Sequence, residues 1–178
     1  MNLISIDIGF TNMAIVHVST DFTNTEVFNI YKINLHCFKE TQVHLSMIKF
    51  IETYKKLFEE VDLIIIERQP PQGLTNIQDI LAYNFYNKVK LICPRSMHKY
   101  FYISKLDYEA RKKFTTKIAD NYLKDNYTYK LLERKHDVAD AFCLALYYIQ
   151  NNKDKFVPVK EIPEDLNNYF DSFRYVKA

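Results

Sequence analysis

The sequence predicts an α/β domain built on a mixed β-sheet with helices on both faces. Three observations predict this class. Three strand-like segments follow one another near the N-terminus, a continuous apolar run at 61–66 is typical of a buried central strand, and segments with helical apolar spacing flank that run. The expected order is three antiparallel strands followed by alternating helices and strands.

The three N-terminal strands are expected to form an antiparallel meander. Residues 3–8 alternate, which places the isoleucines of the segment on one face and Asp7 on the other. Gly9 permits a tight turn. Segments 14–18 and 27–33 then read as the second and third strands, joined by a polar connection.

The rest of the chain alternates between helical and strand patterns. Residues 61–66 form the buried strand, so that Glu67 stands at its carboxyl end, and 89–93 form a short strand before Pro94. Helical spacing of apolar or basic residues predicts four helices, at 41–60, 77–88, 107–124 and 137–151.

Length and composition bound the organisation. The chain has 178 residues, of which 48% are hydrophobic, so we expect one domain at 1–152 and a C-terminal extension at 153–178 that packs on the domain or on a partner subunit. Three dispersed cysteines are expected to be reduced, and no apolar run is long enough to span a membrane, so an intracellular protein is expected. A net charge of +2 neither demands nor excludes a polyanionic partner.

Four carboxylates in apolar surroundings are the main functional signal. Asp7, Glu67 and the pair Asp137 and Asp140 lie in three separate places that an open sheet can bring to one edge. A buried carboxylate is costly unless it is paired or binds a metal. An oxygen-only donor set without a histidine or cysteine cluster favours Mg²⁺, and two such ions held by several acids hydrolyse phosphodiesters.

Each of these signals also has a simpler interpretation. The basic residues at 105–135, with Arg111-Lys112-Lys113 at their centre, could form an ordinary solvated helix face. Asp137 and Asp140 could be favourable first-turn charges of a helix. Glu67 could pair with Arg68. The segment 7–12 is similar to the phosphate loop of sugar kinases, but the chain has only one other glycine for the further phosphate turns such enzymes need.

Taken together, these residues resemble the poxvirus Holliday junction resolvases. That family belongs to the RuvC-type branch of the RNase H-like superfamily, alongside the mitochondrial junction resolvases of fungi. The resemblance covers roughly residues 3 to 150 in consistent order. The matching blocks are Ser5-Ile6-Asp7-Ile8-Gly9-Phe10-Thr11-Asn12, Glu67-Arg68-Gln69-Pro70, Arg111-Lys112-Lys113 and Arg134-Lys135-His136-Asp137-Val138-Ala139-Asp140-Ala141.

The resemblance implies a homodimeric endodeoxyribonuclease that makes paired nicks in four-way DNA junctions, with two Mg²⁺ ions for which Mn²⁺ is an expected substitute. In poxviruses this activity resolves replication concatemers, which implies the host cytoplasm. Asp7, Glu67, Asp137 and Asp140 are the implied metal ligands. A lysine of the basic block is implied at the scissile phosphate or the water, and its spacing to the following helix favours Lys113 over Lys112.

DNA contacts are expected from basic residues near these blocks, namely Arg68, Arg111, Lys112, Lys117 and Lys135. Aromatic residues at 100–102, beside Arg95 and His98, are candidates to stack at a junction. The chain departs from the family at Pro71-Gln72-Gly73, where a basic residue is common, and at His136, where an acid often stands. Two alternatives stay open, a nuclease for other branched or flapped nucleic acids and a junction-binding protein without cleavage.

Overall fold

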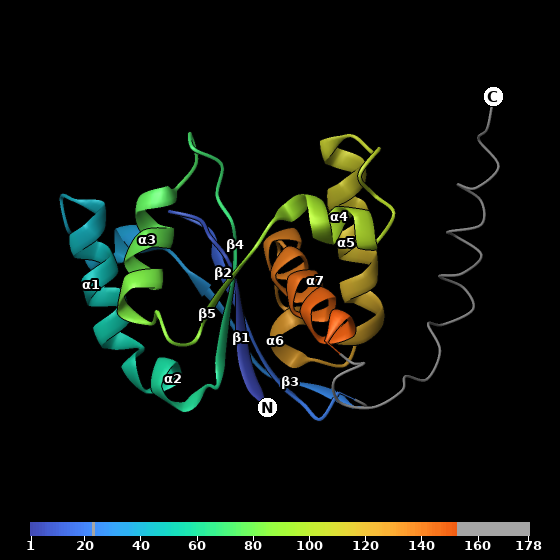
Figure 1. Ribbon diagram of the computed structural model, residues 1–178, viewed down its shortest axis with the longest axis horizontal. Helices are drawn as coiled ribbons and strands as arrows, with labels where there is room; N and C mark the ends of the chain where they lie inside the picture. Colours follow the sequence, from blue (N-terminus) through green and yellow to red (C-terminus); the bar gives the residue numbers. More distant parts are fainter. Residues whose placement is uncertain (23, 153–178) are drawn as a thin grey trace.

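The computed structural model describes residues 1–22 and 24–152 of the chain. One five-stranded sheet has the order β3-β2-β1-β4-β5 (Figure 1). Its strands are β1 (Asn2–Asp7), β2 (Met13–Thr20), β3 (Thr25–Ile33), β4 (Leu63–Glu67) and β5 (Val89–Ile92). The first three strands pair antiparallel, whereas β4 pairs in parallel with both β1 and β5. The predicted mixed sheet is therefore confirmed.

Two helical layers cover the sheet, as predicted (Figure 1). One layer holds α1 (Val43–Thr53), α2 (Lys55–Glu60) and α3 (Thr75–Asn84). The other holds α4 (Pro94–Tyr100), α5 (Tyr108–Leu123), α6 (Tyr127–Lys130) and α7 (His136–Asn151). A 3₁₀ helix, η1 (Leu35–Phe38), precedes α1.

Alternation along β1 divides the core into two halves. Ile4, Ile6 and Ile8 pack with α1, α2 and α3, whereas Leu3 packs in the cluster that contains the apolar residues of α5 and α7. The alternate residue Asp7 therefore belongs to the α7 side of the sheet, because side chains two positions apart on a strand share a face. This alternation is what directs Asp7 toward the acids of α7.

The helices differ from the prediction in number and also in extent, since the helix expected at 77–88 is α3, which ends at Asn84. The single helix expected at 41–60 is two helices, because Tyr54 between them leaves helical geometry at φ −104° and ψ 19°. The apolar stripe continues across this break, since the ring centroid of Phe50 lies 5.2 Å from that of Tyr54 and 5.6 Å from that of Phe58. Three short elements were not predicted, η1, α4 and α6, because four to seven residues carry too little periodicity.

Gly9 allows the chain to turn back tightly after Asp7. A Cβ atom at this position would lie 2.9 Å from the backbone carbon of Asn12 and 3.0 Å from the backbone nitrogen of Met13. These neighbours are backbone atoms at the start of β2, so they cannot rotate away. The glycine therefore fixes the close approach of β1 and β2 beside Asp7.

We expect Gly9→Ala to lower the free energy of unfolding by roughly 1–3 kcal/mol, because one of the two strands must shift to relieve this overlap. Chemical denaturation followed by circular dichroism measures the change. Thr11→Ala is the matched control, since Thr11 is exposed in the same turn, and it should alter stability by less than about 0.5 kcal/mol. Equal stability of the Gly9→Ala protein and the wild type would contradict this account of the turn.

The expected packing of the C-terminal extension, 153–178, lies outside the described residues. No helix within the described residues is long and apolar enough to cross a membrane.

Candidate active site

Asp7 and Glu67 stand at the carboxyl ends of two adjacent parallel strands. Ile6 of β1 is in register with Ile66 of β4, so the acid that follows each of them lies at the same edge of the sheet. The start of α7, which carries Asp137 in its first turn and Asp140 one turn further on, lies over these strands. Burial raises the pKa of Asp7 most, and the charges of Asp140, Glu67 and Asp137 raise it further, so the four acids form one electrostatic site.

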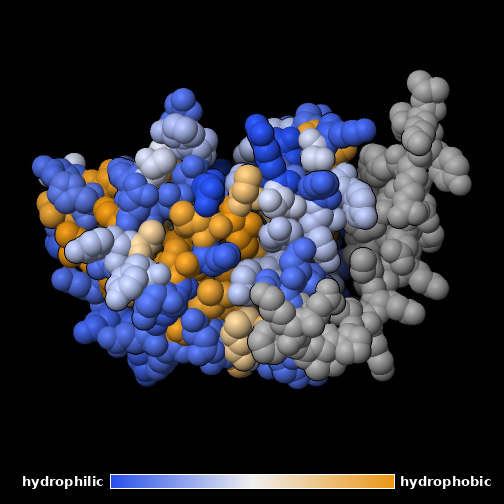
Figure 2. All heavy atoms as spheres, in the orientation of Figure 1, coloured by the Kyte–Doolittle hydropathy of each residue, from blue (hydrophilic) through white to orange (hydrophobic). Residues whose placement is uncertain are grey.

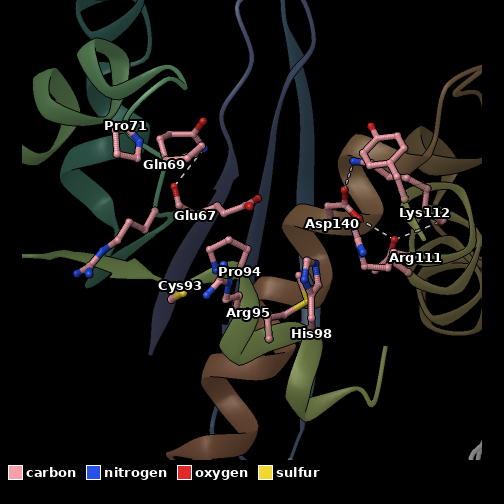
Figure 3. Close-up of a pocket in the computed structure, with 15 residues that line it drawn as sticks. Glu67, Gln69, Pro71, Cys93, Pro94, Arg95, His98, Arg111, Lys112 and Asp140 are labelled. Carbon is pink, nitrogen blue, oxygen red and sulfur yellow. Dashed lines mark hydrogen bonds and ion pairs between the residues drawn. The ribbon is translucent and has the colours of Figure 1, made fainter. Parts of the chain in front are cut away.

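A pocket of about 500 Å³ opens beside these acids. Figure 2 shows the molecule hollowed between the loop after β4 and the ends of α4 and α5. Within the pocket, Glu67 projects from one wall and Asp140 with Lys112 from the opposite wall (Figure 3). The walls are basic and apolar, formed by Arg68, Pro70, Pro71, Cys93, Pro94, Arg95, Met97, His98, Tyr108, Arg111 and Thr115 among others.

Asp7 and Glu67 lack a balancing cation of their own. Within residues 1–22 and 24–152, no hydrogen bond or ion pair reaches either carboxylate. Burial, together with the charge of Asp140, raises the pKa of Asp7 well above its usual range and that of Glu67 to about 7. The two acids therefore bind protons more strongly than ordinary carboxylates do.

Asp137 and Asp140 differ from this pair because both have cationic partners. Asp137 accepts hydrogen bonds from Lys32 at 2.5 Å and from Arg134 at 2.8 and 3.2 Å. Asp140 forms an ion pair with Lys112 and accepts a hydrogen bond from the hydroxyl of Thr115 at 2.6 Å. Burial raises the pKa of Asp137, but the bonds from Arg134 and Lys32 outweigh it, and the net pKa is lowered.

The structure brings Lys112 into the site and leaves Lys113 outside it. The side chain of Lys112 lines the pocket, whereas that of Lys113 is exposed and is not part of the lining. Burial lowers the pKa of Lys112, but the neighbouring charge of Asp140 outweighs this and raises it. Lys112 is therefore an ammonium at neutral pH inside the site, whereas the role at the scissile phosphate for which Lys113 was favoured stays a prediction.

The other predicted DNA contacts divide into two groups. Arg68 and Arg111 line the pocket, and Arg111 is held by a hydrogen bond of 2.5 Å to the carbonyl of Leu106. Lys117 is exposed on α5 outside the pocket. Lys135 also lies outside it, where its ammonium is 3.6 Å from Asp120 and 4.8 Å from the ring centroid of Tyr129.

Several site residues were not identified from the sequence. Thr115 and Tyr108 share the α5 face of Lys112, and this helical spacing could have been read once Lys112 was chosen. Lys32 lies in no motif, and Arg134, although it opens the matching block before α7, was assigned no role. Of the aromatic candidates, Phe101 is buried and Tyr102 is exposed, whereas their basic neighbours Arg95 and His98 line the pocket.

The donor chemistry of the site fits a divalent cation. Its acids offer only oxygen atoms, which hard cations prefer. In the described part of the chain, no three acid, histidine or cysteine side chains are already gathered at coordination distance, and the positive charge beside Asp140 is the Lys112 ammonium. Asp7 and Glu67, whose pKa values are raised despite the nearby charge of Lys112 and which no cation contacts within residues 1–22 and 24–152, would gain a direct counter-charge from the ion.

The raised pKa of Glu67 predicts an unusual effect of pH on stability without metal. Its value of about 7 in the folded state exceeds the ordinary value of 4.5, so unfolding releases a proton between these pH values. Stability should therefore be favoured at low pH and lost as pH rises through 7. Compared with Glu67→Gln, which lacks this group, wild type should lose roughly 2 kcal/mol between pH 5 and pH 8, after discounting for partial exposure.

Denaturant unfolding of both proteins in EDTA across this pH range checks the prediction. The histidines are common to both proteins, so their titration cancels in the comparison. Parallel stability profiles of wild type and Glu67→Gln would show that Glu67 titrates normally.

Comparison with solved structures identifies the fold as RNase H-like. The fowlpox virus resolvase in complex with its substrate Holliday junction DNA is 19% identical, with a TM-score of 0.67 over 85% of this chain and 98% of that chain. The yeast mitochondrial Holliday junction resolvase is 19% identical, with a TM-score of 0.61 over 83% and 78%. RuvC of Thermus thermophilus, in complex with a Holliday junction substrate, is 12% identical, with a TM-score of 0.53 over 85% and 96%.

Comparison with curated protein sequences gives no match. A family model described as poxvirus A22 protein, however, matches residues 1–152. That match covers both strand-end acids, the basic block of α5 and the paired acids of α7. The chain therefore belongs to the poxvirus A22 protein family.

Proposed function

We propose that this protein is a structure-selective DNA endonuclease that resolves four-way junctions by paired, symmetric nicking. Family membership supports the proposal, as do the folds shared with the fowlpox, yeast and bacterial resolvases. The observation that carries it is the meeting of Asp7, Glu67 and Asp140 around the Lys112 ammonium, beside a pocket with basic walls. Carboxylates that can bind a cation lie here beside basic side chains that can bind a phosphate, and this combination suits phosphodiester hydrolysis.

Asp7, Glu67, Asp137 and Asp140 would hold the divalent cations, which we propose to be two Mg²⁺ ions that Mn²⁺ can replace. When bound, such ions supply an activated water and stabilise the leaving oxygen of the phosphodiester. The side chains of the protein do the rest. Lys112 binds a non-bridging oxygen of the scissile phosphate, and Thr115 orients Asp140 through its hydroxyl.

Binding of the DNA backbone falls to the basic residues around the pocket. Arg68, Arg95 and Arg111 line its walls and present guanidinium groups to phosphates. Exposed Lys113 and Lys117 extend this basic surface along α5. Binding should therefore weaken steeply with salt, because each neutralised phosphate releases counterions.

The protein should act as a homodimer within the host cytoplasm, where the resolution of viral DNA concatemers takes place. A four-way junction has two equivalent strands to cut, so two sites related by a twofold axis match it. Analytical ultracentrifugation with and without junction DNA tests this. We expect two protomers per junction, and one protomer on a cleaved junction would contradict paired nicking.

Cleavage of labelled DNA substrates tests the function itself. A synthetic four-way junction is incubated with the protein and Mg²⁺ beside a linear duplex, a flap and an RNA–DNA hybrid, with Asp137→Asn as the inactive control. Paired nicks confined to the junction and absent from the control are the expected result. Cleavage of flaps or hybrids in preference to the junction would contradict the proposed substrate, and tight binding without any cleavage would contradict an enzyme.

A further inference from the structure

Lys32 reaches this site from β3, the edge strand two positions away from β1 in the sheet. In the antiparallel pairing, Asp7 of β1 is opposite Ala14 of β2, and Ala14 is opposite Lys32 of β3. Residues directly opposite one another point to the same face, so Lys32 shares the face of Asp7 two strands away. Ala14 between them is small and fully buried. Its short side chain leaves room for the lysine stem to reach α7.

The Lys32 ammonium ends on Asp137, 105 residues further along the chain. Its Nζ atom lies 2.5 Å from Oδ2 of Asp137, and the two side chains are 24% and 7% exposed. Because both groups are largely shielded from water, their attraction is screened less than that of a surface ion pair. It joins the edge strand to the first turn of the helix that carries two of the proposed cation ligands.

Asp137 has little acceptor capacity left for a cation while this contact stands. A carboxylate offers about four lone-pair positions. Oδ2 accepts from both Lys32 and Arg134, whereas Oδ1 accepts from Arg134 and lies 3.2 Å from Nδ1 of His136. A divalent ion cannot be coordinated by both oxygens of Asp137 unless one of these donors moves away.

We infer that Lys32 is an internal counter-ion of the active site, which neutralises Asp137 and competes directly with a divalent cation for this carboxylate. The inference rests on the proposed function, since it takes the acids to be cation ligands. Lys32 is thus a positioning residue that sets the affinity of Asp137 for a cation. Arg134 is less suited to that role. Its side chain is 52% exposed, so its ion pair with Asp137 is screened by water and is easily broken.

Mn²⁺ titration of the full-length protein without DNA, read by electron paramagnetic resonance, tests the inference. Lys32→Gln should bind Mn²⁺ about tenfold more tightly than wild type, which is the loss of one charged hydrogen bond expressed as an affinity. Lys32→Arg keeps the charge and should remain near wild type. Lys55→Gln removes a lysine from an exposed ion pair with Glu59 and should change nothing.

A double-mutant cycle tests whether Lys32 acts through Asp137. In an Asp137→Asn background, the Lys32→Gln change should alter the Mn²⁺ affinity by less than twofold. An undiminished effect in that background would overturn the inference, as would an unchanged or weaker affinity in the single variant. A purely structural lysine would lower the unfolding temperature without tightening Mn²⁺ binding, which would also overturn it.

The same titration separates this inference from the proposed function. If neither wild type nor Lys32→Gln binds Mn²⁺, the acids are not a cation site and both proposals fall. If wild type binds and cleaves junctions but Lys32→Gln binds no more tightly, only the role of Lys32 falls.

Discussion

Glu67→Gln should reduce junction cleavage by roughly 10³-fold or more while leaving junction binding within about threefold of wild type. The carboxylate stands at the end of β4 without a cationic partner in the described chain, and its pKa is raised to about 7. Loss of one cation ligand removes several kcal/mol of transition-state stabilisation. Binding survives because the change removes a negative charge from a surface that meets phosphates.

Single-turnover cleavage in Mg²⁺ and gel-shift binding without added metal measure the two effects separately. Glu59→Gln is the matched control, because that side chain is 62% exposed on α2, in the helical layer on the face of the sheet away from α7. It should cleave as wild type does. Cleavage by Glu67→Gln at the wild-type rate would remove Glu67 from the chemistry.

Lys112→Met should lower the cleavage rate by roughly 10²- to 10³-fold, whereas Lys113→Met should lower it by less than about threefold. Removal of one donor to a developing charge in an enclosed site costs about 2.7–4 kcal/mol. Lys112 lines the pocket and pairs with Asp140, and its neighbour is exposed on the next face of α5. Both changes remove one positive charge from the same helix, so they have the same effect on the net charge of the protein.

Cleavage rates of both variants at several salt concentrations measure this difference. The defect of Lys113→Met should vanish at low salt, where weak phosphate contacts are strengthened. The defect of Lys112→Met should persist there. A larger loss from Lys113→Met than from Lys112→Met would reverse the assignment.

Alternation and strand order were enough to predict where the acids lie. The pattern of β1 directs Asp7 to the α7 side, and the buried run of β4 ends at Glu67 beside it. The three-residue spacing of Asp137 and Asp140 places both on one face at the start of α7, with Asp137 in its first turn. These features depend on local periodicity, which can be read from the sequence alone.

The basic side chains could not be placed in the same way. Whether Lys112 or Lys113 enters the site depends on the rotation of α5, which is set by its packing and by Asp107 at its start, where the carboxylate accepts a hydrogen bond from Ala110. Lys135 turns to Asp120 and Tyr129 instead of toward the pocket. Such outcomes depend on tertiary contacts of long, flexible side chains.

Lys32 shows the same limit most clearly. Its role depends on a cross-strand row through Ala14 and on a helix more than a hundred residues away. No motif marks it, and only the assembled sheet brings it to Asp137.

The most direct test of the central claim is the form of DNA released from a supercoiled plasmid that extrudes a cruciform. Two opposed nicks made within one binding event convert the circle to a linear molecule, whereas independent single nicks give a relaxed circle. The account predicts linear plasmid as the first product in Mg²⁺, and none with Glu67→Gln. Accumulation of nicked circles before any linear product would contradict resolution by paired nicking.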